Sequence, residues 1–285
     1  MTDHSTPEDV KLPAPGRRRA ADPRRFRAPI PEGADQPIVL EGAEPYSAQG
    51  DRRGALVLHG FTGCPQSMRP LAEAFAAAGY TVELPRLPGH GTAVEDMARY
   101  GWPDWAAAAE DAYADLAART DSVVVAGLSM GGTLTLHLAV QHPGIAAIVL
   151  VNPVVEPADF ASLVDIAQAQ LDAGEQFIQG VGNDVADPDV TELAYTSMPN
   201  AAVLSLVDGL KALKEDLASI RPSALILHST QDHIVPPSSV KLLTESLTSP
   251  YEVVELDRSF HVATIDYDRD IINERAIAFA NKLAK

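Results

Sequence analysis

The sequence predicts an α/β protein built on a mostly parallel central sheet with helices on both faces. Short runs of continuous apolar residues recur along the chain, and each is followed by a segment with helical spacing. Strands that are apolar throughout are buried on both faces, which is typical of parallel sheets. Hydrophobic residues make up 46% of the 285 residues, which is enough for a large core.

Residues 55–151 supply four of the predicted strands. The run Ala55–His59 (ALVLH) is short, apolar and followed by a glycine. Residues Pro65–Ala78 gather apolar side chains on one helical face and stop at Gly79, so they predict a helix. The same alternation continues with strands at Tyr80–Leu84, Ser122–Ala126 and Ala146–Val151 and with helices at Asp104–Arg119 and Ser129–Gln141.

The second half continues this pattern after an interruption. Residues from about 155 to 218 have helical but no clear strand patterns and lie between two predicted strands, so we expect a cap over the carboxyl ends of the sheet. Ile38–Leu40 is a weak candidate for an edge strand. The remaining elements are strands at Ala224–His228 and Tyr251–Leu256 and helices at Ser238–Leu247 and Asp266–Leu283.

Composition and motif content argue against several classes of partner and cofactor. The net charge of −17 at pH 7 disfavours nucleic acid and anionic membranes as partners. Apolar stretches stay well short of the ~20 residues of a transmembrane helix. Cys64 is the only cysteine, so an internal disulfide is excluded. The sequence has neither a cluster with metal-ligand spacing nor a phosphate-binding glycine motif, and we therefore expect no metal and no cofactor.

Residues 1–34 differ from the rest of the chain. They are rich in Pro and Arg and lack periodic apolar residues, which predicts a disordered tail before a single domain at 35–285. The alternative role of such a basic tail is contact with RNA, with a membrane or with the acidic domain of the same chain. The arginines are not followed by the apolar stretch of a signal peptide, which predicts a cytoplasmic location.

The segment AGLSMGG, residues 126–132, joins a run of β-branched residues to a helical pattern. The spacing Gly127-x-Ser129-x-Gly131 is typical of a nucleophilic serine on a sharp turn from strand to helix. Such a turn strains the serine backbone, and its crowding leaves room only for small residues two positions before and after it. We therefore predict that Ser129 is a nucleophile.

A nucleophilic serine requires a base and an orienting acid, which follow it in the order acid, then histidine, for this motif. His261 lies in the loop after the last strand, at the same sheet edge as the serine, and is the predicted base. His228 lies inside a strand pattern, and His233 follows an acidic residue in a turn. Asp232, after the strand ALILHST, is the favoured acid, and Asp257, four residues before the predicted base, is the alternative.

The oxyanion formed during acyl transfer requires hydrogen-bond donors. One is the backbone N–H of Met130, the residue after the nucleophile. The second is expected from the loop HGFTG after the first long strand, where Gly60 permits a tight turn and Phe61 supplies the N–H. His59 in this loop and His90 in the loop PGHG are expected to hold loop structure.

Five motifs carry a resemblance to a known family. They are HGFTG at His59–Gly63, PRLPGHG at Pro85–Gly91, GLSMGG at Gly127–Gly132, DHIVPP at Asp232–Pro237 and SFHVATIDYD at Ser259–Asp268. Their combination, from about Ala55 to the C-terminus, resembles the α/β-hydrolase superfamily and, within it, the bacterial carboxylesterase and monoacylglycerol lipase group. The resemblance implies the α/β-hydrolase fold with a helical cap insertion.

The resemblance also implies roles for individual residues. It implies Ser129, Asp232 and His261 as a catalytic triad, with the Phe61 and Met130 amides as the oxyanion hole. The stretch NDVADPDVTELAY at 183–195 resembles the cap of bacterial monoacylglycerol lipases, in which the glutamate of ELAY is associated with holding the glycerol hydroxyls. That glutamate is Glu192; without the resemblance it reads as an ordinary acid on a helix surface.

These features predict a serine hydrolase that cleaves monoacylglycerols and short-to-medium-chain carboxylic esters through an acyl-enzyme. The alternatives are a carboxylesterase without glyceride preference, an amide or carbon–carbon hydrolase or acyltransferase with the same triad, and a ligand-binding scaffold. A ligand-binding scaffold does not require an intact Ser, Asp and His, so the presence of all three argues against it. The cap residues expected to shield an acyl chain are Leu163, Ile166, Leu171, Phe177 and Ile178.

Overall fold

The computed structural model describes residues 37–180 and 182–285 and contains a seven-stranded sheet with strand order β1-β3-β2-β4-β5-β8-β9. All neighbouring strands are parallel except β1, which pairs antiparallel with β3 at the edge. The fold is therefore the mostly parallel α/β architecture that the sequence predicts. The strands are β1 (Tyr46–Ala48), β2 (Arg53–Leu58), β3 (Thr81–Leu84), β4 (Ser122–Leu128), β5 (Ala147–Val151), β8 (Ser223–Ser229) and β9 (Tyr251–Leu256).

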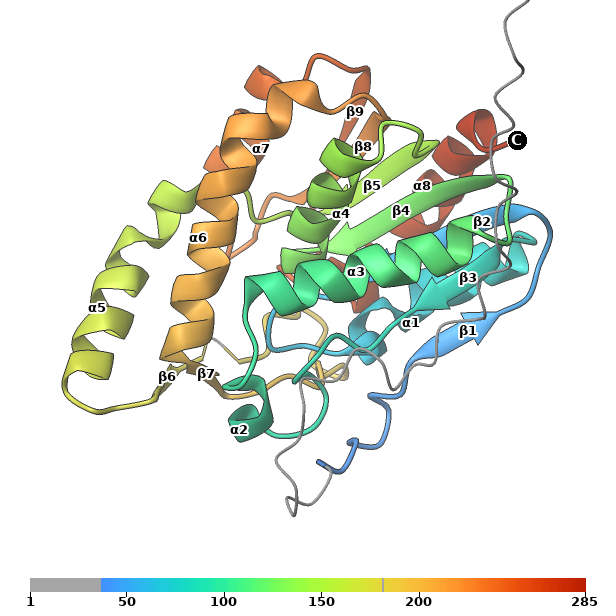
Figure 1. Cartoon of the computed structure of the whole chain (residues 1–285). Coiled ribbons are helices and arrows are strands. Elements are labelled where there is room, and N and C mark those ends of the chain that lie inside the picture. The colour runs from blue at the N-terminus through green and yellow to red at the C-terminus, as the bar shows by residue number, and fades with distance from the viewer. Residues whose placement is uncertain (1–36, 181) are drawn as a thin grey trace, which may run out of the picture.

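Helices cover both faces of the sheet (Figure 1). Successive residues of β2 point to opposite faces, so Leu56 and Leu58 enter one core and Ala55 and Val57 enter the other. The first core is completed by α3 (Trp102–Ala117) and α4 (Met130–Gln141). The second is completed by α1 (Pro65–Ala77) and α8 (Arg269–Leu283), and α7 (Ser238–Ser246) follows β8.

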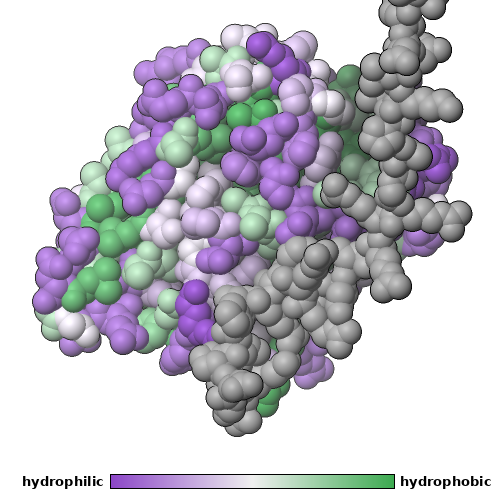
Figure 2. Space-filling view, in the orientation of Figure 1, coloured by the Kyte–Doolittle hydropathy of each residue, from purple (hydrophilic) through white to green (hydrophobic). Residues whose placement is uncertain are grey.

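The chain between β5 and β8 contains two helices that lie beside each other (Figure 1). This inserted segment, residues 157–219, comprises a 3₁₀ turn at Pro157–Phe160, α5 (Ala161–Asp172), β6 (Phe177–Gln179), β7 (Ser197–Pro199), α6 (Asn200–Asp216) and a 3₁₀ turn at Leu217–Ser219. Strands β6 and β7 pair antiparallel, apart from the main sheet. Figure 2 shows apolar surface over α5, the helix whose Ile166 is 49% exposed.

Most predicted elements occur within a few residues of their expected bounds, but the short strands differ. Ile38–Leu40 is not a strand, and Ile38 is 86% exposed; the edge strand is β1 instead. The inserted segment, expected to lack strands, contains the pair β6 and β7. Strands of three residues are too short to give a periodic signal, and their pairing depends on distant residues. The tail predicted at 1–34 lies outside the described residues.

The register of the sheet aligns the carboxyl ends of its central strands. Leu128 pairs with Val151, Val151 with Leu227, and Ser229 with Leu256. The loops after β4, β5, β8 and β9 therefore open at one edge, where parallel sheets bind ligands. Within 37–180 and 182–285, every helix is too short or too polar to cross a membrane.

Candidate active site

Ser129 occupies the sharp turn between β4 and α4. Its φ of 56° and ψ of −118° are unusual for a residue with a side chain, and such strain persists only where the surroundings enforce it. The surroundings here are hydrogen bonds on both sides of the turn. The Ser129 N–H donates to the Val151 carbonyl at 3.0 Å, and the Ser129 carbonyl accepts from the Thr133 N–H at 3.2 Å.

The two flanking glycines are required by close backbone approach. A Cβ placed on Gly127 would lie 2.1 Å from the carbonyl oxygen of Gly131, and a Cβ on Gly131 would lie 2.1 Å from that of Leu58. Real Cβ atoms do not approach oxygen so closely, so only glycine fits at either position. The steric reason that the sequence suggests for the Gly-x-Ser-x-Gly spacing is thus present in the structure.

Asp232 and His261 meet through a short hydrogen bond. His261 Nδ1 lies 2.8 Å from Asp232 Oδ2, and the side chains are 9% and 2% exposed. The other carboxylate oxygen, Oδ1, accepts the N–H groups of Ile234 and Val235, both at 2.8 Å. Burial alone raises the pKa of Asp232, but hydrogen bonds from His261 and these two amides outweigh it, so the pKa lies below its ordinary value.

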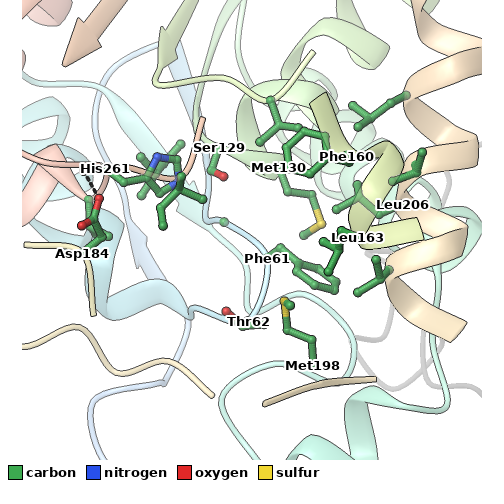
Figure 3. A pocket seen from close by; sticks show the side chains of 18 of the residues that line it. Phe61, Thr62, Ser129, Met130, Phe160, Leu163, Asp184, Met198, Leu206 and His261 are labelled. Carbon is green, nitrogen blue, oxygen red and sulfur yellow. Dashed lines mark hydrogen bonds between the residues drawn. The ribbon is translucent and has the colours of Figure 1, made fainter. Parts of the chain in front are cut away.

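Ser129 and His261 line the same pocket. In Figure 3, Ser129 lies between His261 on one side and the side chains of Phe61 and Met130 on the other. Since Nδ1 of the imidazole is held by Asp232, its Nε2 is the nitrogen left to face the pocket. Gly60 brings the loop after β2 close to the serine, because a Cβ on Gly60 would lie 3.4 Å from Ser129 Cβ.

Phe61 and Met130 also line this pocket. Met130 is the first residue of α4, and the first N–H groups of a helix have no acceptor within the helix. Its amide therefore carries partial positive charge beside the serine hydroxyl. The Phe61 ring packs edge-on against Trp105, with centroids 5.6 Å apart, which fixes the loop that carries its N–H.

The competing acid and histidines lie elsewhere. Asp257 is exposed, and its carboxylate accepts from the Thr230 hydroxyl at 3.4 Å. His228 is half-buried within β8, and burial lowers its pKa. His233 is 59% exposed and pairs with Asp184. His59 is fully buried, contacts the Gly60 carbonyl through Nδ1 at 2.9 Å and accepts the Leu87 N–H at 3.1 Å, which is the structural role expected for it.

Glu192 lies in the loop before β7, not on a helix surface as the residues alone suggest. It is half-buried and lines the same pocket. Gly63 makes room for it, because a Cβ there would lie 2.6 Å from Glu192 Oε1. Burial raises the pKa of Glu192 to about 7, although the charge of His261 and a hydrogen bond from Ser67 oppose the rise.

The apolar part of the pocket is lined mostly by residues other than those that the sequence predicts. Of the five expected residues, Leu163 lines it, whereas Ile166 faces solvent. Leu171, Phe177 and Ile178 are not among the lining residues. Helical spacing identifies an apolar face but not the partner that the face packs against. The remaining apolar lining of the inserted segment is Phe160, Met198, Val203, Leu206, Val207 and Leu210.

Comparison with known proteins agrees with this fold. The model of the alpha/beta hydrolase family matches residues 55–273 of the chain. The chain belongs to the alpha/beta hydrolase family. A thermostable monoacylglycerol lipase from Bacillus sp. (strain H-257) is 46% identical over 255 residues, which are 88% of this chain and 99% of the relative. A carboxylesterase from Bacillus subtilis (strain 168) is 26% identical over 242 residues, which are 84% of this chain and 97% of that carboxylesterase.

A solved structure gives the same result. It was described with LipS and LipT, two metagenome-derived lipolytic enzymes, and is 41% identical to this alpha/beta hydrolase. The two superpose with a TM-score of 0.80, over 86% of this chain and 100% of the other. The comparison supports an alpha/beta hydrolase fold throughout the described domain.

Three residues of this alpha/beta hydrolase contact the His261 loop but were missed from the sequence. Asn152 follows β5 with a φ of 42°, and its amide donates to the His261 carbonyl at 2.7 Å. The Asn152 side-chain oxygen accepts the Ser229 N–H at 2.7 Å, which ties the ends of β5 and β8 to that loop. The Asp184 carboxylate accepts the His261 N–H from the inserted segment, and Asp266, five residues after His261 in the chain, accepts the Phe260 N–H. Single polar residues in loops give no pattern by which sequence analysis could select them.

Proposed function

We propose that the protein is a serine ester hydrolase that cleaves monoacylglycerols and short-to-medium-chain carboxylic esters. The observation that carries the proposal is the 2.8 Å contact between His261 Nδ1 and Asp232 Oδ2 at the wall of a pocket that Ser129 shares. With Nδ1 engaged by Asp232, Nε2 is the imidazole nitrogen available to take the proton of the serine hydroxyl. This arrangement therefore supports Ser129, Asp232 and His261 as nucleophile, orienting acid and base.

The reaction proceeds in two halves. The Ser129 hydroxyl attacks the ester carbonyl while His261 Nε2 takes its proton, and the negative charge on the carbonyl oxygen is stabilised by the N–H groups of Phe61 and Met130. His261 then gives the proton to the departing alcohol, leaving an acyl group on the serine. Water attacks this acyl-enzyme with His261 again as base, which releases the acid and restores the serine. Asp232 stabilises the charged imidazole in both halves.

Two features of the pocket support a monoacylglycerol as substrate. Its apolar side, supplied by the inserted segment, matches an acyl chain. Glu192 lines the same pocket and has a pKa of about 7, so near neutral pH its carboxyl group accepts hydrogen bonds and, when protonated, donates one. Both properties suit the two free hydroxyls of a glycerol group. The 46% identical relative named as a monoacylglycerol lipase supports the same substrate class.

We also propose that residues 155–218 form the cap of the active site, because the apolar lining described above comes from them. The cytoplasmic location and the absence of a nucleic-acid partner stay predictions from the sequence.

A chain-length series of monoacylglycerols and nitrophenyl esters tests the function. Wild-type protein should hydrolyse both classes, with the highest kcat/KM on a glyceride of short-to-medium chain. Ser129→Ala should lose activity on both, because the nucleophile is removed. A preference for aryl or alkyl esters over every glyceride would instead indicate a general carboxylesterase, and hydrolysis that survives Ser129→Ala would contradict the proposal.

A further inference from the structure

A carboxylate of the inserted segment contacts both loops that carry the proposed acid and base. Asp184 Oδ2 accepts the backbone N–H of His261 at 3.0 Å, and Asp184 Oδ1 lies 2.8 Å from Nδ1 of His233, the residue after Asp232. The Asp184 carbonyl also accepts the Val262 N–H at 3.1 Å. Two consecutive amides of the loop, those of residues 261 and 262, are therefore held by one residue of the inserted segment.

A second carboxylate, on the side of His261, accepts hydrogen bonds from the inserted segment. Asp266, which follows the His261 loop and is 3% exposed, accepts the N–H of Ala186 at 2.7 Å and that of Asp187 at 3.1 Å. It also accepts the Phe260 N–H at 3.0 Å. Residues 184–187 and 260–266 thus exchange hydrogen bonds through two carboxylates. We call this arrangement the carboxylate clamp.

We propose that Asp184 is a positioning residue that holds the catalytic base in line with the serine. The proposal rests on the proposed function, in which His261 is the base. Asp232 fixes the imidazole through Nδ1, but the position of the ring also depends on the backbone that carries it. That backbone lies in a loop between β9 and α8, and Asp184 holds it at the residue that carries the base. A misplacement of about 1 Å is enough to lower kcat about 10²-fold.

The position of Asp184 distinguishes its role from that of Glu192. Both line the pocket and both belong to the inserted segment. The Asp184 carboxylate, however, is engaged by His261 and His233, and its side chain is 13% exposed. Asp184 should therefore affect every ester alike, because the base acts in both halves of the reaction, whereas Glu192 should affect glycerides.

The test compares Asp184→Ala and Asp184→Asn with wild type on nitrophenyl acetate, a substrate too small to need the acyl pocket. Asp184→Ala removes the acceptor for the His261 N–H, so kcat should fall about 10- to 100-fold. Acylation and deacylation use the same base and should slow together, so KM should stay within about twofold. Asp184→Asn keeps one acceptor oxygen and should restore kcat to within about threefold of wild type.

Asp189→Ala is the matched control, because Asp189 is an exposed aspartate of the same segment. It should keep wild-type kcat. If Asp184→Ala does not fold, Asp184→Glu replaces it, since the extra methylene displaces both oxygens while keeping the charge. The proposal is wrong if the folded variant keeps wild-type kcat, if only KM changes, or if Asp184→Asn is as slow as Asp184→Ala. Failure of the proposed function would appear separately, as wild-type protein that does not hydrolyse the ester at all.

Discussion

Replacing Gly127 with alanine should disable the turn that holds Ser129. The new Cβ would lie 2.1 Å from the carbonyl oxygen of Gly131 and 2.2 Å from its carbonyl carbon. An ordinary contact is about 3.5 Å, so β4 and the start of α4 must separate by about 1 Å or more. Overpacking of this kind costs about 1–3 kcal/mol of unfolding free energy, and a 1 Å displacement of the serine lowers kcat about 10²-fold.

The assay is ester hydrolysis together with thermal unfolding of Gly127→Ala. Gly144→Ala is the control, because a Cβ on Gly144 meets no atom within 4 Å and its φ needs no glycine. We expect the control to keep wild-type kcat and Tm, and Gly127→Ala to lose both. Wild-type kcat and Tm in Gly127→Ala would refute the steric explanation of the turn.

Three further substitutions test other parts of the site. Asp232→Asn should lower kcat by about 10³- to 10⁴-fold through loss of the oriented imidazole, while Asp257→Asn should change it little; the reverse order in steady-state kinetics would reassign the acid. Glu192→Gln should lower kcat/KM for monoacylglycerols more than for nitrophenyl esters, and an equal loss on both would remove its proposed role. Burial lowers the pKa of His59 to about 4, against an ordinary value of 6.5, so its imidazole binds a proton more tightly in the unfolded chain than in the folded one. The contribution of His59 to the free energy of unfolding therefore falls by about 3 kcal/mol as the pH drops from about 6.5 to 4. Thermal unfolding across that range should show a smaller loss in His59→Asn, and an unchanged slope would contradict the assignment.

The arrangement of the sheet and the nucleophile turn could be predicted because both follow from local rules. Apolar runs mark buried strands, and the glycines around Ser129 are dictated by atoms within five residues or on the adjacent strand. The parallel order then brings the loops carrying Asp232 and His261 to one edge. These are consequences of periodicity and topology.

The carboxylate clamp and the pocket lining could not be predicted in this way. Asp184 and Asp266 act through backbone N–H groups some eighty residues away in the sequence, and any loop carboxylate can make such bonds. The apolar lining depends on which face of α6 turns toward Ser129, and this is decided by the packing of α6 on α5, α3 and α4. The strands β6 and β7 form because the chain returns to pair over three residues, without a periodic signal of their own.

The activation of Ser129 by His261 can be measured as the rate at which a fluorophosphonate labels the protein, since this reagent reacts with a serine only when a base activates its hydroxyl. We expect one adduct, located at Ser129 by peptide mass spectrometry, absent in Ser129→Ala and formed at least about 10³-fold more slowly in His261→Ala. Labelling of wild type no faster than of His261→Ala, or an adduct on another residue, would show that Ser129 is not a nucleophile activated by His261.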